Sequence, residues 1–81
     1  MTLDRVIAVS RAAQRYGGPG SLSTGEALTA ALVLNRHDWL ADMDYTIAQA
    51  LDRIEEDSIA QLRQAERAIG SSAGESEGDH A

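Results

Sequence analysis

The chain has 81 residues, of which 43% are hydrophobic and only 4% are aromatic, and it carries a formal net charge of −6. This length predicts a single domain, and the absence of cysteine excludes disulfides and thiolate metal sites. No stretch has the length and hydropathy of a transmembrane helix, and the N-terminal segment is too charged for a signal peptide, so we expect a cytoplasmic protein.

The charge is unevenly distributed along the chain. Residues 1–37 carry +2, residues 38–57 carry −6, residues 58–69 carry +1 and residues 70–81 carry −3. Residues 38–57 contain one arginine and seven acidic residues: Asp38, Asp42, Asp44, Asp52, Glu55, Glu56 and Asp57. A negative field of this density repels nucleic acid and attracts basic surfaces.

The first element is an amphipathic helix over residues 3–16. Its apolar residues recur at three-and-four spacing, with Thr2 as the expected N-cap. The sequence GGPG at residues 17–20 ends it, because Gly17 can adopt the left-handed conformation and Pro19 cannot continue a helix. GGPG lacks the lysine and the Ser/Thr of a nucleotide-binding P-loop, so we interpret it as an interhelical turn.

A second helix is predicted from a capping box formed by Ser23 and Glu26, with Leu22 placed to pack onto Ala27. Residues 26–35 are apolar on nearly every side. Such a helix is normally the buried centre of a small bundle. Asn35 is expected to close it.

Residues 37–43 predict a short helix capped by Asp38 or His37. This segment holds the only tryptophan, and the chain has no phenylalanine. A bundle this small needs its few large side chains inside, so we expect Trp39 in the core.

A second capping box, Thr46 with Gln49, starts the next helix. Its expected inward stripe is Ile47, Leu51 and Ile54, continued on the same side by Leu62, Ala65 and Ile69. Ile59 falls off this stripe, and Ser58 with Gln61 offers a third capping box. Two interpretations therefore stay open: a break near Asp57, or one continuous helix.

The fold class that follows is all-α: a compact bundle of four to five helices formed by residues 1–69. Residues 70–81 are small and acidic with little to bury, which predicts a disordered acidic tail.

The sequence lacks the combinations of residues that catalysis or metal binding requires. A metal at His37 and Asp38 needs three or four convergent ligands, and the only other histidine is His80. The aspartates at 38, 42 and 44 lack the glycine and distal glutamate of a calcium loop. Adjacent helical residues such as Glu55 and Glu56 point about 100° apart. We expect no catalytic residue, metal or cofactor, and hence no enzyme.

The acidic middle segment is the remaining candidate. Asp52, Glu55 and Glu56 sit at positions i, i+3 and i+4, so we expect them to share one helix face. With Asp38, Asp42, Asp44 and Asp57 they form the expected partner-binding surface, directed at a basic protein. The alternative is a solvated face that only favours solubility.

Two further classes stay open. Residues 46–64, TIAQALDRIEEDSIAQLRQ, approach the rhythm of a helix-turn-helix, so a dimerising transcriptional regulator or antitoxin is an alternative. Asp52-Arg53 occupies the place of the turn glycine, and EEDS is acidic where phosphate contacts need positive charge. The third class is a self-associating accessory subunit, since small cores favour homodimers.

The run TGEALTAALVLNRHDWLADMDYTIAQALDRI, from Thr24 to Ile54, resembles small phage and mobile-element proteins of the anti-CRISPR kind. The resemblance is one of size, acidity and helical content; it matches no consensus motif and assigns no functional residue. It implies a non-enzymatic inhibitor in the bacterial host cytoplasm that occupies the nucleic-acid-binding surface of a protein complex such as a CRISPR effector subunit. The seven arginines and the absence of lysine agree with a GC-rich bacterial or phage genome.

Overall fold

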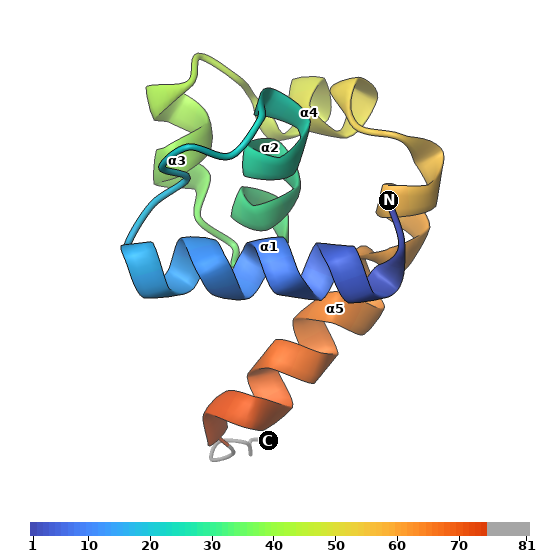
Figure 1. Cartoon of the computed structure of the whole chain (residues 1–81). Helices are drawn as coiled ribbons and strands as arrows, with labels where there is room; N and C mark the ends of the chain where they lie inside the picture. Colours follow the sequence, from blue (N-terminus) through green and yellow to red (C-terminus); the bar gives the residue numbers. More distant parts are fainter. Residues whose placement is uncertain (75–81) are drawn as a thin grey trace.

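Helix α2 (Thr24–Val33) is the central element of the computed structural model, which describes residues 1–74 and their side chains as far as residue 70 (Figure 1). It contacts each of the other four helices. Its apolar side chains are buried almost completely, with Leu28 and Ala30 at 0% exposure. This confirms the prediction that an apolar helix forms the centre of the bundle.

Helix α1 (Leu3–Tyr16) begins and ends where its local signals place it. The hydroxyl of the N-cap Thr2 accepts a hydrogen bond from the backbone N–H of Arg5, at 3.1 Å. Gly17 ends the helix with φ +86°, a left-handed conformation that glycine adopts without the steric penalty of a Cβ. Residues 17–20 then form the expected turn.

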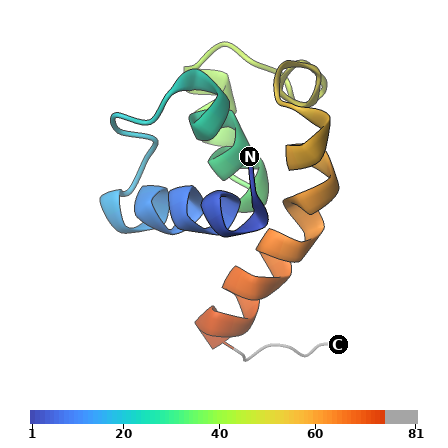
Figure 2. The same ribbon diagram turned by 45° about the vertical axis from the view of Figure 1, so that its right-hand side comes forward.

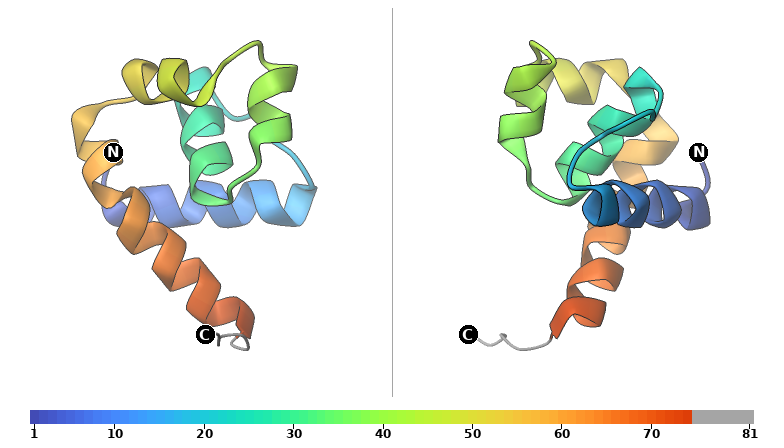
Figure 3. Two further views of the ribbon diagram at one scale, coloured as in Figure 1. Left: turned by 180° about the vertical axis from the view of Figure 1, so that it is seen from behind. Right: turned by 60° about the vertical axis from the view of Figure 1, so that its left-hand side comes forward.

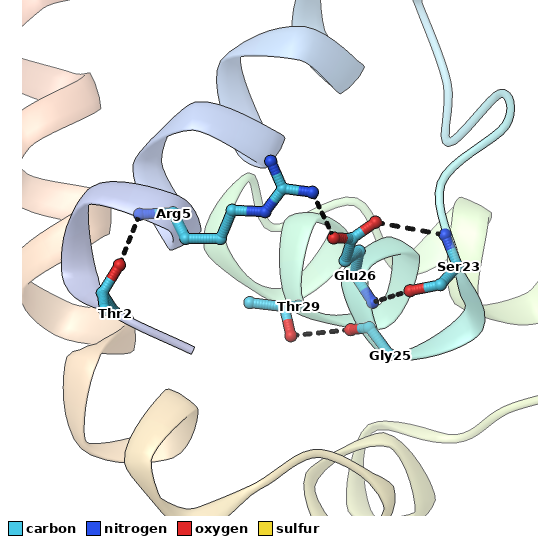
Figure 4. A network of polar contacts seen from close by, with 6 residues as sticks. All are labelled: Thr2, Arg5, Ser23, Gly25, Glu26 and Thr29. Atoms are coloured by element: carbon cyan, nitrogen blue, oxygen red, sulfur yellow. Dashed lines mark hydrogen bonds and ion pairs between the residues drawn. The ribbon is translucent and has the colours of Figure 1, made fainter.

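The N-terminal ends of α1 and α2 are joined by one polar network (Figure 4). The Ser23 hydroxyl accepts from the Glu26 N–H and the Glu26 carboxylate accepts from the Ser23 N–H, so the predicted capping box is confirmed. The other carboxylate oxygen of Glu26 accepts from the Arg5 guanidinium at 2.6 Å. Glu26 therefore caps α2 and holds α1 against it.

Helix α3 (His37–Asp42) inserts Trp39 and Leu40 into the core, where they are 5% and 2% exposed. Its flanking turns contain two non-glycine residues in the left-handed region, Asn35 at φ +56° and Asp44 at φ +63°. Asparagine and aspartate tolerate this region best among residues with side chains. The prediction of a buried Trp39 is confirmed.

Helix α4 (Ile47–Arg53) begins at the predicted capping box of Thr46 and Gln49. Its predicted inward stripe is wrong at Ile47, which is 55% exposed, whereas Ala50 is fully buried. Ile47 instead lines a small hollow with Leu32 and Leu40 at the surface of the bundle and stays largely in solvent.

Helix α5 (Glu56–Gly74) is separated from α4 by a break at Ile54 and Glu55. Ile54 is extended, with φ −83° and ψ 163°, and its side chain enters the core. The helices meet at a sharp corner there (Figure 2). The continuous helix is excluded, and the break precedes the predicted position near Asp57.

The expected third capping box is wrong. The N–H groups of Ser58 and Ile59 donate to the carbonyl oxygen of Glu55, so Ser58 already lies inside the first turn of α5. Its side chain is buried at 1% exposure instead of capping. Further along α5, Ala65 and Ile69 pack against Val6 and Val33, as the stripe predicted.

The elements form a compact all-α bundle, and no strand occurs among residues 1–74. Helices α3 and α4 cover α2 on one side and α1 crosses it on the other, while α5 projects beyond α1 (Figure 3). The predicted tail begins inside α5, which continues to Gly74; residues 75–81 lie outside the described part of the chain. No helix of the described residues has the length and hydropathy to cross a membrane.

Candidate acidic interaction surface

The seven predicted partner-binding residues are all exposed and follow one another along the chain from α3 to the start of α5. We call this set the acidic edge. Helix α3 contributes two, the α3–α4 loop one, α4 one, the junction one and α5 two: Asp38, Asp42, Asp44, Asp52, Glu55, Glu56 and Asp57.

The shared helix face expected for three of these residues does not exist. Asp52 lies on α4, Glu55 in the junction and Glu56 at the start of α5, so no single helix carries them. The i, i+3, i+4 rule holds only within a continuous helix, and the extended backbone at Ile54 interrupts it. The acidic edge is therefore a tertiary arrangement around a corner.

Tertiary structure brings Asp44 and Asp52 together instead. Both line one shallow hollow, whose remaining walls come from the α3–α4 loop and α4: Met43, Tyr45, Gln49 and Arg53. The half-buried Tyr45 lies between the capping box of α4 and the core. This hollow combines carboxylates with partly apolar walls, which suits contact with a basic and aliphatic side chain.

The contacts of Asp38 in the structure differ from the helix capping that was predicted for it. The N-cap of α3 is Arg36, with no side-chain capping bond, so capping by Asp38 or His37 is wrong. Asp38 instead accepts two hydrogen bonds from the Arg36 guanidinium, at 2.8 and 3.0 Å. These bonds hold the pKa of the Asp38 carboxyl below its ordinary value. Arg36 also lies 4.5 Å from the centre of the Trp39 ring, a cation–π contact.

Most of the acidic edge has no intramolecular partner. Glu55 pairs with the α-amino group of Met1 at 3.0 Å, although its side chain is 77% exposed. The other five carboxylates make no hydrogen bond or ion pair within the described residues: Asp42, Asp44, Asp52, Glu56 and Asp57. Exposed and unpaired, these carboxylates can engage a basic partner without first breaking an internal contact.

Charge is segregated across the bundle. From Asn35 to Asp57 the seven acids oppose only Arg36 and Arg53, a net charge of −5. Helix α1 carries three arginines and Asp4, a net charge of +2. Helix α2 lies between α1 and α4 (Figures 1 and 3), so the acid on α4 is separated from the arginines of α1, whereas Glu55 at the α4–α5 junction lies beside the start of α1.

Among residues 1–70, no group of three or more histidine or acidic side chains is placed to hold a metal ion. His37 is exposed at the start of α3. The acidic edge can thus bind by its field and by individual contacts, and it lacks the convergence that coordination chemistry needs.

Sequence reasoning missed a second feature, a cavity between α2 and the α4–α5 junction. Residues from three segments line it, among them Gly25, Thr29, Arg53 and Ser58. One signal was available: Thr29 is polar in the middle of an otherwise apolar helix. The pairing of α2 with residues 53–58 had no signal, because it depends on the break at Ile54.

Comparison of the chain with protein-family models, with curated protein sequences and with solved structures finds no match.

Proposed function

We propose that the protein is a non-enzymatic binding protein whose acidic edge occupies a basic, nucleic-acid-binding surface of a bacterial protein complex. The observation that carries this proposal is the set of five exposed carboxylates without intramolecular partners, which follow one another from the end of α3 to the start of α5. In this role it acts in the bacterial cytoplasm as a phage- or mobile-element-encoded inhibitor of the anti-CRISPR kind.

The physics of association supports this role. A surface of one sign, on a rigid framework, raises the encounter rate with a surface of the opposite sign and orients the two partners. The arginines of α1 are separated from α4 by α2 and would be repelled by the same partner, which favours one docking orientation. The buried Trp39 anchors α3 beneath the edge, so little ordering entropy is lost on binding.

Two matched charge variants test the proposal. Asp44→Lys with Asp52→Lys reverses the hollow of the acidic edge, whereas Asp4→Lys with Glu66→Lys reverses two exposed acids on α1 and α5. Each pair changes the formal net charge from −6 to −2, so only the position of the charge differs. All four sites are exposed, and circular dichroism should report unchanged helicity.

Immobilised wild-type protein is exposed to bacterial lysate, and the bound proteins are identified by mass spectrometry. We expect nucleic-acid-binding proteins that heparin elutes, their loss from the Asp44/Asp52 variant, and their retention by the Asp4/Glu66 variant. If both variants retain the same proteins, or if both lose them, the acidic edge is not the binding surface.

The helix-turn-helix alternative makes the opposite prediction. Helices α4 and α5 form a corner, but α5 begins with Glu56 and Asp57, which would face DNA phosphates. A gel shift with mixed bacterial DNA should therefore show no complex at low salt. A salt-sensitive complex would favour a regulator, and sedimentation as an oligomer in the absence of any partner would favour a self-associating subunit.

A further inference from the structure

A cavity of about 330 Å³ lies where the N-terminal ends of α2 and α5 meet. This volume is within the range of small-molecule sites, roughly 300–1,000 Å³. Residues of α2, of the end of α4 and of the first turn of α5 form its walls, and Figure 4 shows the side formed by α2, with Gly25, Glu26 and Thr29.

Ser58, in the wall formed by α5, is a buried polar residue whose hydroxyl lacks a hydrogen-bond partner. Its side chain is 1% exposed, and its hydroxyl has no hydrogen-bond partner in the described part of the chain. Burying a hydroxyl without a partner is unfavourable, and alanine at this position would avoid that cost. A residue that costs stability and lines a cavity is a candidate for ligand contact.

Helix α2 shows the same preference for small and polar groups. A Cβ on Gly25 would meet no atom within 4 Å, so alanine would fit and would favour the helix. Thr29 is fully buried, and its hydroxyl donates to the Gly25 carbonyl at 2.7 Å. The cavity is thus kept open at positions on two helices where more stable residues would fit, and polar groups form part of its wall.

Some of the hydrogen-bonding groups around the cavity already have partners within the chain, and others do not. Both carboxylate oxygens of Glu26 accept hydrogen bonds, from Arg5 and from the Ser23 N–H. Glu55 pairs with the Met1 amino group. Arg53 makes no ion pair or hydrogen bond among the described residues, and the first-turn N–H of Gly25 has no intrahelical partner. Apart from the second oxygen of the Glu55 carboxylate, the groups left over, with the Ser58 hydroxyl, are donors.

We infer that this cavity binds a small organic anion of the carboxylate class, held between Arg53 and the first turn of α2 with the Ser58 hydroxyl as a further donor. Met1 and Ile54 supply an apolar wall for the body of the ligand. Helix N-termini favour negative charge, and arginine recognises carboxylates through paired N–H donors. The cavity shares Glu55 with the acidic edge and Arg53 with the hollow of that edge. The two proposals are tested with different probes and at different residues, so either can fail alone.

Three probes of similar shape and different charge test the class of ligand: hexanoate, hexanamide and hexylammonium. Each is titrated into the full chain at constant ionic strength, and backbone amide resonances are followed by NMR. We expect hexanoate to shift Gly25, Thr29 and Ser58 saturably, hexanamide to bind about tenfold more weakly or worse, and hexylammonium to leave these resonances unchanged. Equal shifts by all three probes, a preference for hexylammonium, or no shift at these residues would overturn the inference.

Variants locate the site. Arg53→Gln and Ser58→Ala should each weaken hexanoate binding about tenfold, whereas Arg63→Gln, at an exposed position of α5, should not. Ser58→Ala and Gly25→Ala should unfold at a higher temperature than the wild type, so lost binding cannot be ascribed to unfolding. Unchanged affinity in both Arg53→Gln and Ser58→Ala would contradict the assignment.

Discussion

Glu26 is the residue whose replacement should reveal most about how the bundle is held together. It accepts the Ser23 N–H as part of the capping box and pairs with Arg5 at 2.6 Å across the α1–α2 contact. Glu26→Gln keeps the size and an acceptor oxygen but removes the charge, while Glu26→Ala removes both contacts.

The expected magnitudes follow from exposure. The Arg5 side chain is 56% exposed, so solvent screens the ion pair, which should contribute about 0.5 kcal/mol. The interaction of the carboxylate with the α2 dipole adds a similar amount, so Glu26→Gln should cost about 1 kcal/mol near pH 7. Loss of the capping bond raises the cost of Glu26→Ala to about 2 kcal/mol. Each kcal/mol corresponds to a fall in Tm of about 4–8 °C in a domain of this size.

The sign of the pH dependence is also determined. The hydrogen bond from Arg5, followed by that from the Ser23 N–H, holds the pKa of Glu26 below its ordinary value of 4.5, against a smaller opposing effect of burial. A lowered folded-state pKa stabilises the protein above the unfolded pKa, and this contribution is lost as the pH falls through the folded pKa. The difference between wild type and Glu26→Gln should therefore be complete at pH 7 and disappear in acid.

Urea unfolding followed by circular dichroism at 222 nm, over a series of pH values, measures these differences. Glu66→Gln, at an exposed position on α5, is the control and should stay within about 0.5 kcal/mol of the wild type. A double-mutant cycle with Arg5→Gln isolates the ion pair. A Glu26→Gln deficit that is the same at all pH values, or a coupling energy of zero at pH 7, would refute this account of α1–α2 docking.

Three further substitutions test the packing, each by chemical or thermal unfolding. Leu28→Ala at the fully buried centre of α2 should cost about 3 kcal/mol, and a cost below about 1 kcal/mol would contradict its central place. Ile47→Ala should change stability by less than about 0.5 kcal/mol, because this side chain is exposed; a core-like loss would restore the predicted inward stripe. Gly20→Ala should cost about 1–2 kcal/mol, since φ is +58° and the new Cβ would lie 2.9 Å from Cδ2 of Tyr16. The cost should be smaller in a Tyr16→Ala background, and additive effects would exclude the contact.

Sequence reasoning succeeded for the fold wherever the relevant interaction is local. The caps at Thr2, Ser23 and Thr46 each depend on residues within three positions, and the structure contains all three. Gly17 ended α1 for an equally local reason, its tolerance of positive φ. Burial of Trp39 followed from composition, because the chain offers so few large side chains for its core.

At the start of α5, short-range sequence patterns no longer determine where the helix begins. Ser58 and Gln61 have the same spacing as the two capping boxes that do form, yet Ser58 lies inside the helix. What differs is Ile54, which gains burial when its backbone is extended, and that moves the break ahead of Ser58. Burial against α2 is a long-range contact, which short-range patterns do not contain.

The candidate binding residues also divide into features that the sequence located and features that only the tertiary structure brought together. Sequence alone located the acidic residues and their excess over arginine, because charge is a property of composition. Only tertiary structure decided that Asp52, Glu55 and Glu56 surround a corner, and that Asp44 and Asp52 line one hollow. It also decided the cavity at Gly25, Arg53 and Ser58, since a site drawn from three segments exists only once the helices have packed.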